Sequence, residues 1–231
     1  MNKRKTALSI ISLLLIAAIS FIAFREGCFE KKNGPASGPK NKADVESNIM
    51  KNEEMELAKH YKTDVVFLGD SLTAMCDWGE LFSESGLTIE NRGISGNKTT
   101  DVLERLNAVI DLKPRKIFLM IGINDLWHGR NEDAVIESLM SIFDRFDEHK
   151  EVQIFIQSVL PTGLHDLNQG VAALNGFLYE ESGRRAYTYI DLYGDFVHGG
   201  VIKAGLDVDG VHLSGEGYRV WKEKVHSFVA G

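Results

Sequence analysis

Cysteine is scarce in this sequence, with only Cys28 and Cys76 among 231 residues. One lies in the N-terminal tract and the other in the body of the chain, which is neither a disulfide framework nor the paired spacing of a zinc site. The seven histidines include no H-E-x-x-H or similar grouping. The sequence therefore predicts no metal site, no disulfide scaffold and no cofactor.

A net positive charge is confined to the N-terminal part of the chain. Residues 1–43 carry eight Lys or Arg and two Asp or Glu, whereas the whole chain has a net charge of −7, which leaves −13 on residues 44–231. So acidic a body repels nucleic-acid phosphates, and no Lys/Arg-rich stripe interrupts it. We therefore expect no nucleic-acid partner.

One long apolar run is present, at residues 6–24, directly after Lys3, Arg4 and Lys5. Its 19 uncharged residues are just long enough to span a bilayer as a helix, and the basic start predicts that the rest of the chain lies across the membrane. We expect a signal peptide or membrane anchor at residues 1–24 and a flexible linker at 25–43. A single domain at 44–231 would then be membrane-anchored outside the cytoplasm, or secreted or periplasmic.

Short apolar strands alternate with helices in the body of the chain. Strands are expected at residues 65–68, 87–90, 116–121, 152–159 and 187–192, and helices at 45–60, 100–112, 134–146, 171–181 and, capped by Ser214, up to 228. This alternation predicts an α/β fold with a parallel sheet covered on both faces. In such folds the active site forms at the carboxyl ends of the strands.

Four motifs are expected at those strand ends or close to the last helix. Residues 67–73 read FLGDSLT, residues 91–97 read NRGISGN, residues 120–126 read MIGINDL and residues 209–213 read DGVHL. Taken singly, each has an ordinary structural explanation, because Asp-Ser and Asn-Asp pairs favour turns and helix caps and most loop glycines only serve turns. Taken together, they supply a hydroxyl nucleophile, a histidine base with a nearby carboxylate, and amide donors.

In this order, the four motifs resemble the blocks of the SGNH hydrolases, also called GDSL esterases. The resemblance covers residues 62–229 and implies a flavodoxin-like three-layer α/β/α sandwich. It also implies a serine esterase in which Ser71 is the nucleophile, His212 the base and Asp209 the orienting acid. The oxyanion hole would be formed by the backbone N–H groups of Ser71 and Gly93 and by the Asn124 amide.

Other residues of the blocks have less direct roles. Asn91 and Gly96 fit the N-x-G-x-x-G pattern of the second block, and Asp70 and Asp125 are expected to be structural hydrogen-bonding residues. Trp78, Trp127 and His128 could wall a substrate pocket or simply pack in the core or at the rim.

Alternative hydrolases fit less well. The G-x-S-x-G elbow of α/β-hydrolases is absent, since Ser71 has no glycine two residues later. The run from Ser95 to Lys98 matches the S-x-x-K of serine β-lactamases, but no K-T-G or S-D-N follows it.

The expected substrate is a small-molecule or carbohydrate ester with a short acyl group, acetyl above all. The motifs follow one another too closely for a long apolar lid to lie between them. A lysophospholipase or thioesterase, an acyltransferase using the same serine, and a non-catalytic binding module stay as alternatives. The first two share the serine chemistry, and the third would need the filled catalytic positions to be unused.

Overall fold

The computed structural model describes residues 63–231, so the segments expected at 1–24, 25–43 and 45–60 lie outside the described residues. One parallel sheet has the strand order β2-β1-β3-β4-β5. Its strands are β1 (Val65–Gly69), β2 (Ile89–Gly93), β3 (Lys116–Met120), β4 (Gln153–Gln157) and β5 (Thr188–Ile190). This is the flavodoxin-like order, so the predicted doubly wound sheet is confirmed.

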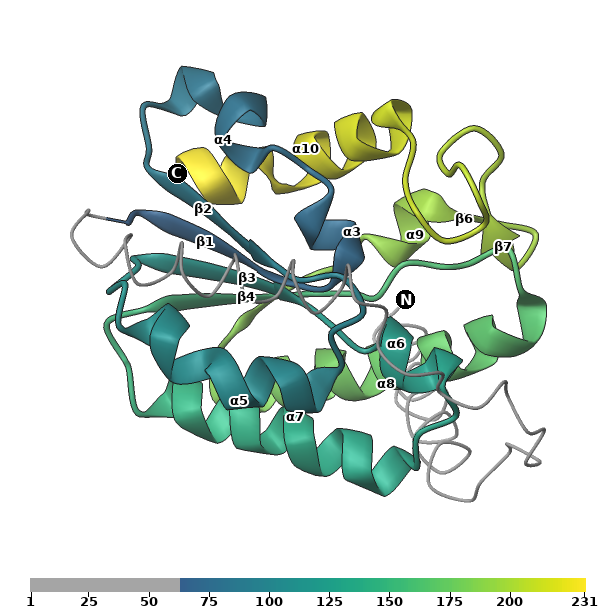
Figure 1. The fold of residues 1–231 in the computed structure, drawn as a ribbon, viewed down its shortest axis with the longest axis horizontal. Coiled ribbons are helices and arrows are strands. Elements are labelled where there is room, and N and C mark those ends of the chain that lie inside the picture. The colour runs from purple at the N-terminus through teal and green to yellow at the C-terminus, as the bar shows by residue number, and fades with distance from the viewer. Residues whose placement is uncertain (1–62) are drawn as a thin grey trace, which may run out of the picture.

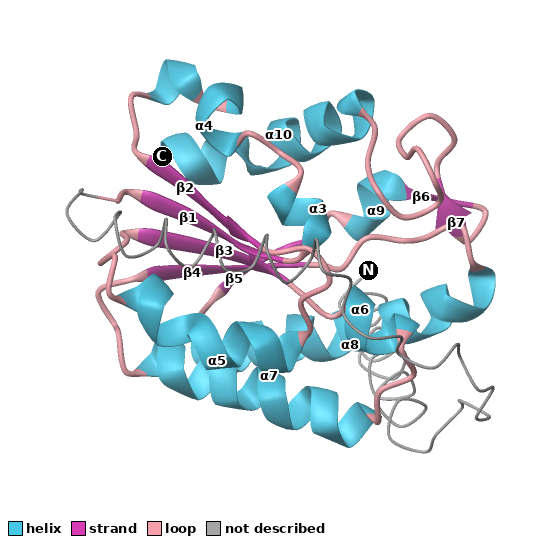
Figure 2. Cartoon of the chain, viewed as in Figure 1, coloured by secondary structure: helices cyan, strands magenta, loops and turns pink. Residues whose placement is uncertain are grey.

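Helices cover both faces of the sheet, which makes a three-layer sandwich (Figures 1 and 2). One layer holds α5 (Thr99–Ile110), α7 (Glu132–Asp147) and α8 (His165–Arg185), and the opposite layer holds α4 (Trp78–Leu81) and α10 (Gly215–Ala230). The remaining elements are α3 (Ser71–Ala74), η1 (Ser83–Ser85), α6 (Ile123–Trp127), α9 (Tyr193–Phe196) and the hairpin of β6 (Val197–His198) and β7 (Val201–Ile202). Among residues 63–231, none of the helices has the length and apolar character that a membrane span requires.

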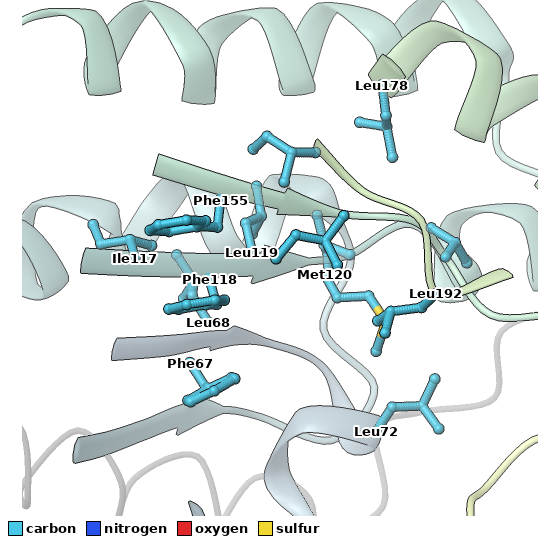
Figure 3. Packing of buried hydrophobic residues seen from close by; sticks show 14 of the residues in the cluster. Phe67, Leu68, Leu72, Ile117, Phe118, Leu119, Met120, Phe155, Leu178 and Leu192 are labelled. Carbon is cyan, nitrogen blue, oxygen red and sulfur yellow. The ribbon is translucent and has the colours of Figure 1, made fainter. Parts of the chain in front are cut away.

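A row of stacked aromatic rings crosses the sheet and forms the centre of the core. Phe67, Phe118 and Phe155 are register partners on β1, β3 and β4, and their ring centroids lie 4.9 and 4.4 Å apart. Trp78 stacks on Phe67 at 3.9 Å and is fully buried, so this tryptophan belongs to the core and not to a pocket wall. Figure 3 shows the three phenylalanines together with the aliphatic side chains around them. Such stacked, wholly buried rings fix the strands on which the functional residues depend.

The structure differs from the sequence-based expectations at several boundaries. The second strand begins two residues later than expected and continues to Gly93, so Asn91 lies within the strand and not beyond it. The helix expected at residues 171–181 spans His165–Arg185, and α3, α4, α6, α9 and the β6–β7 hairpin were not expected. The predicted cap of the last helix is confirmed, because Ser214 Oγ accepts the Gly217 N–H at 3.2 Å.

Candidate active site

Ser71 is the first residue of α3, directly beyond the end of β1. The tight exit requires Gly69, because a Cβ there would lie 2.3 Å from Thr73 Oγ1 and 2.4 Å from Met120 O. The Ser71 residue is only 8% exposed. The loop that contains Asp209 and His212 lies against Ser71, and His212 contacts its hydroxyl group.

Side chains from three other elements hold α3 by its carbonyl groups. Tyr218 Oη donates to Leu72 O at 2.8 Å, and Trp78 Nε1 donates to Thr73 O at 2.9 Å. Asn91 Nδ2 lies within hydrogen-bonding distance of the same Thr73 carbonyl group and of two further ones, those of Ala74 and Cys76. These bonds satisfy the carbonyl groups that a four-residue helix leaves without partners. The serine therefore stands on a helix that is fixed at its far end.

The loop that covers Ser71 brings a histidine and a carboxylate to it. His212 Nε2 lies 3.0 Å from Ser71 Oγ, and His212 Nδ1 lies 2.7 Å from Asp209 Oδ2. The other oxygen of Asp209 accepts the backbone N–H groups of Val211 and His212 at 3.0 and 2.8 Å. The structure thus brings together three residues that are separated by up to 141 positions in the sequence.

The electrostatics of this trio favour proton transfer away from the serine. The hydrogen bond from His212 lowers the pKa of Asp209 to about 2, with help from the backbone N–H groups of His212 and Val211. An ionised carboxylate can only accept hydrogen bonds, so the His212 Nδ1 must carry a proton. The Nε2 atom of neutral His212 is then an acceptor facing the Ser71 hydroxyl.

A close contact between two glycines positions the Asp209–His212 loop. Gly163, in the segment after β4, donates its N–H to Gly210 O at 2.7 Å. A Cβ on Gly163 would lie 3.3 Å from the Gly210 Cα, and Gly210 itself has a φ of +87°, which favours glycine. The segment after β4 was not expected to contribute to the site, and its signal in the sequence is only the single glycine in Pro-Thr-Gly.

Asn124 lies on α6, beyond the end of β3. Its Nδ2 donates to Asn97 O at 3.0 Å, and the second N–H of this amide has no acceptor among residues 63–231. The neighbouring Asp125 is fully buried and accepts Thr99 N and Thr99 Oγ1, both at 2.9 Å, and Arg130 Nη1 at 2.8 Å. Asp125 therefore has the expected structural role and ties α6 to the start of α5.

The expected role of Gly93 as an oxyanion donor conflicts with the geometry. Its N–H donates to Asn91 Oδ1 at 2.9 Å, and a Cβ on it would lie 2.3 Å from Ala74 N, so Gly93 serves the packing of β2 against α3. Gly96 differs in each respect. It is exposed, has a φ of +76°, has open space where a Cβ would stand, and makes no hydrogen bond through its N–H within residues 63–231. Its match to the N-x-G-x-x-G pattern was the signal in the sequence.

A second carboxyl group lies buried beside the serine. Asp70 Oδ1 accepts the Leu72 N–H at 3.0 Å, which is the expected structural role. Burial raises the pKa of Asp70 to about 7, against the lowering effects of this hydrogen bond and of His212. The carboxyl group directly before the serine therefore binds a proton more readily than an ordinary aspartate does.

Exposed apolar side chains occur close in sequence to these site residues. Of the five large apolar side chains that are exposed among residues 63–231, four lie within a few positions of the residues described above. They are Met75, Trp127, Leu164 and Val208, and the fifth is Tyr179 on α8. Trp127 is exposed at the end of α6, the short helix that also holds Asn124, whereas Trp78 is in the core.

Several solved structures resemble this fold. A GDSL-like lipase from Bacteroides thetaiotaomicron has a TM-score of 0.69 and 23% identity, over 80% of this chain and 98% of that chain. A family 3 carbohydrate esterase from Clostridium thermocellum has a TM-score of 0.57 and 20% identity, over 73% of this chain and 99% of that chain. At these identities the likeness shows the fold alone.

Sequence comparisons give the family. An acetylxylan esterase from Geobacillus stearothermophilus is 44% identical over 48 residues, so this chain covers only 22% of that relative's length. The model of the family described as GDSL-like Lipase/Acylhydrolase matches residues 67–220, which is more than half of the chain. The match extends from the segment of Ser71 to beyond His212. The chain therefore belongs to the GDSL-like lipase/acylhydrolase family, a family of serine esterases.

Proposed function

We propose that this chain hydrolyses a short O-acyl ester, acetyl above all, through a Ser71–His212–Asp209 triad. The observation that carries the proposal is the contact of His212 with both partners, at 3.0 Å to Ser71 Oγ and 2.7 Å to Asp209 Oδ2. A serine hydroxyl is a weak nucleophile until a base removes its proton, and these distances are those of such a base.

In the proposed mechanism Ser71 Oγ attacks the ester carbonyl carbon while His212 Nε2 takes the hydroxyl proton. The C–O bond to the alcohol breaks, and His212 returns the proton to the departing alcohol oxygen. A water molecule then repeats the sequence on the acyl-serine, releasing the carboxylic acid and restoring the Ser71 hydroxyl. Asp209 stays ionised throughout and stabilises the imidazolium that forms twice in each cycle.

The negative charge on the carbonyl oxygen needs donors that have no other acceptor. We assign this role to the backbone N–H of Ser71 and to the second N–H of the Asn124 amide. As the third donor we assign the Gly96 N–H in place of Gly93, because Asn91 already accepts the Gly93 N–H. Each such donor contributes about 3–4 kcal/mol to stabilising the transition state.

The identity of the acyl and alcohol groups of the substrate is a further part of this proposal. The relatives named as acetylxylan esterase and carbohydrate esterase support an acetylated carbohydrate as the candidate substrate. The exposed apolar residues close in sequence to the site residues support a second candidate, an ester with an apolar alcohol or acyl group such as a lysophospholipid or thioester. An acyltransferase would share the first half of the mechanism and differ only in the acceptor.

One assay separates these candidates. The purified chain is given 4-nitrophenyl acetate, butyrate, octanoate and palmitate, each with and without a sugar acceptor, and the Ser71→Ala variant serves as the blank. The proposal expects the highest kcat/KM with acetate and free acetate as the product. An optimum at octanoate or beyond would favour a lipase, acetylated sugar would show a transferase, and no serine-dependent turnover of any ester would leave a binding module.

The site is proposed to act outside the cytoplasm, held at the membrane by residues 1–24 or released after their removal. The basic start and the apolar run at residues 6–24 support this location. The full chain should then fractionate with membranes or appear in the medium or periplasm, whereas a chain that begins at Asp44 should be soluble and active. Full-length protein found in the soluble cytoplasmic fraction would contradict the proposal.

A further inference from the structure

Arg105 on α5 reaches from the helix to the carboxyl ends of two strands. Its Nη2 donates to Gly69 O at 3.1 Å and to Arg92 O at 2.9 Å, and its Nε donates to Asn97 Oδ1 at 2.9 Å. Gly69 ends β1 two residues before Ser71, Arg92 lies near the end of β2, and Asn97 follows Gly96. One guanidinium group therefore joins three backbone segments that carry site residues.

The contact with Asn97 continues to Asn124. The Asn97 backbone N–H donates to Ile94 O at 3.1 Å, which closes the turn that contains Gly96. The Asn97 carbonyl oxygen accepts the Asn124 amide at 3.0 Å. A shift of Asn97 would therefore change the direction of the second Asn124 N–H, the one that we assign to the oxyanion.

We propose that Arg105 is a positioning residue, which sets the orientation of the Asn124 amide through Asn97. The inference rests on the oxyanion role that we propose for Asn124. The planar guanidinium suits this task because its N–H groups leave in fixed directions, which a lysine ammonium on a flexible stem cannot reproduce. Burial lowers the pKa of Arg105 to about 10, so the group still carries its proton at neutral pH.

The first test removes the guanidinium without leaving a large cavity. Arg105→Met should lower kcat about 10- to 100-fold and leave KM within about threefold, because a small misplacement of a transition-state donor costs about that much. Lys116→Met is the matched control. Lys116 Nζ also holds two carbonyl groups, Phe228 O and Val229 O at 2.8 and 3.0 Å, but at the opposite edge of the sheet. Lys116→Met should lower the Tm and leave kcat unchanged.

Substitutions of Asn97 test the link from Arg105 through Asn97 to Asn124 with a smaller change of side chain. Asn97→Ala should reproduce most of the loss in kcat, whereas Asn97→Asp keeps an acceptor for Arg105 Nε and should stay within about threefold of the unchanged chain. In an Asn124→Ala background, Arg105→Met should lower kcat further by less than about threefold, since the path ends at Asn124. A full additional loss in that background would overturn the proposal, as would normal kcat in Arg105→Met.

A measurement without turnover separates this inference from the proposed esterase function. In the ¹⁵N-labelled full chain, the side-chain amide signals of Asn124 are identified by their loss in Asn124→Ala. Arg105→Met should shift these signals and speed their hydrogen exchange, and Lys116→Met should not. Unchanged signals in Arg105→Met would overturn the positioning role even if the esterase assay succeeded. Shifted signals would support it even if no ester were hydrolysed.

Discussion

The two edges of the sheet use polar side chains in opposite ways. At the carboxyl edge, Asn91, Arg105 and Asp125 bind backbone groups of neighbouring segments. The Ser71 hydroxyl and the His212 imidazole meet at this edge. At the amino edge, charged side chains mostly pair with one another. Arg185 and Lys150 both contact Asp147, which also accepts the Tyr187 hydroxyl at 2.9 Å.

One surface hollow lies at the amino edge of the sheet. It is a cavity of about 470 Å³, lined by Asp147, Lys150, Arg185 and Tyr187 among others. Because these groups already satisfy one another, the cavity offers little unsatisfied bonding capacity to a ligand. The comparison teaches that the two edges differ in how much bonding capacity their polar groups keep for a ligand.

The strongest test of this contrast removes the nucleophile. Ser71→Ala should lower ester hydrolysis roughly 10⁴-fold or more, because every later step needs the acyl-serine. A serine-directed phosphonate should label Ser71 alone, as shown by mass spectrometry of the labelled peptide. Ser95→Ala is the control and should keep both activity and labelling. Labelling at Ser95 would show that the nucleophile has been misidentified.

A smaller loss is expected from the oxyanion donor. Asn124→Ala should lower kcat roughly 10²- to 10³-fold with little change in KM, because the amide binds the transition state more strongly than the substrate. Asn107 on the same helix as Arg105 accepts a hydrogen bond from Arg145 far from the serine, so Asn107→Ala should leave kcat unchanged. A large KM effect with normal kcat would make Asn124 a substrate-positioning residue.

The exposed side chain of Trp127 should affect substrate preference and not the rate of the chemical step. Trp127→Ala should raise KM about tenfold for 2-naphthyl acetate, since burying part of an aromatic ring contributes about 1–2 kcal/mol, and should leave methyl acetate nearly unchanged. Tyr179→Ala, at the exposed aromatic away from the site, should change neither ester. Equal effects of Trp127→Ala on both esters would indicate a structural role for Trp127.

The smallest expected effect is on stability, and it has opposite signs at the two edges. Burial raises the pKa of Asp70 to about 7, so the folded state binds a proton that the unfolded state releases near pH 4. The free energy of unfolding should therefore fall as the pH rises from 4 to 7. Asp70→Asn should remove this dependence and raise the Tm by a few degrees at pH 8, with little change at pH 4.

Asp147 provides the matched measurement at the amino edge. Burial acts to raise the pKa of Asp147, but hydrogen bonds from Lys150, Tyr187 and Arg185 outweigh it and lower the pKa. Its stabilising contribution should be present above pH 4 and lost as the pH falls further. Asp147→Asn should thus lower the Tm at pH 7 and have little effect at pH 3. The Tm of both variants is measured between pH 3 and pH 8. A change in Tm with the same sign and the same pH dependence in both variants would contradict the predicted difference between the two edges.

Much of the fold was predictable from the sequence because its signals are local. The apolar runs that form β1 and β3 are buried on both faces of the sheet. A continuous apolar run of this kind can be recognised as a buried strand without knowledge of its neighbours. The second strand was less clear, since Ile89, Glu90 and Asn91 are only partly buried and carry no continuous apolar run. Four-residue helices such as α3 and α9 have too few residues for any periodicity to be seen.

By itself, the sequence determined which residues could do the chemistry and at which edge of the sheet they would stand. Motifs that follow parallel strands lie at the same, carboxyl edge of the sheet. Ser71 and Asn124 could therefore be assigned to one edge from the sequence alone. Only the tertiary structure decided which groups are free to act. Gly93 and Gly96 are alike in the sequence, but Asn91 accepts the N–H of one and leaves the other open. Arg105 belongs to none of the sequence motifs. Its proposed role depends on two carbonyl oxygens and one side-chain amide oxygen that come from separate parts of the chain. The sequence could not reveal this role, because hydrogen bonds depend on distance and direction in space and not on separation along the chain.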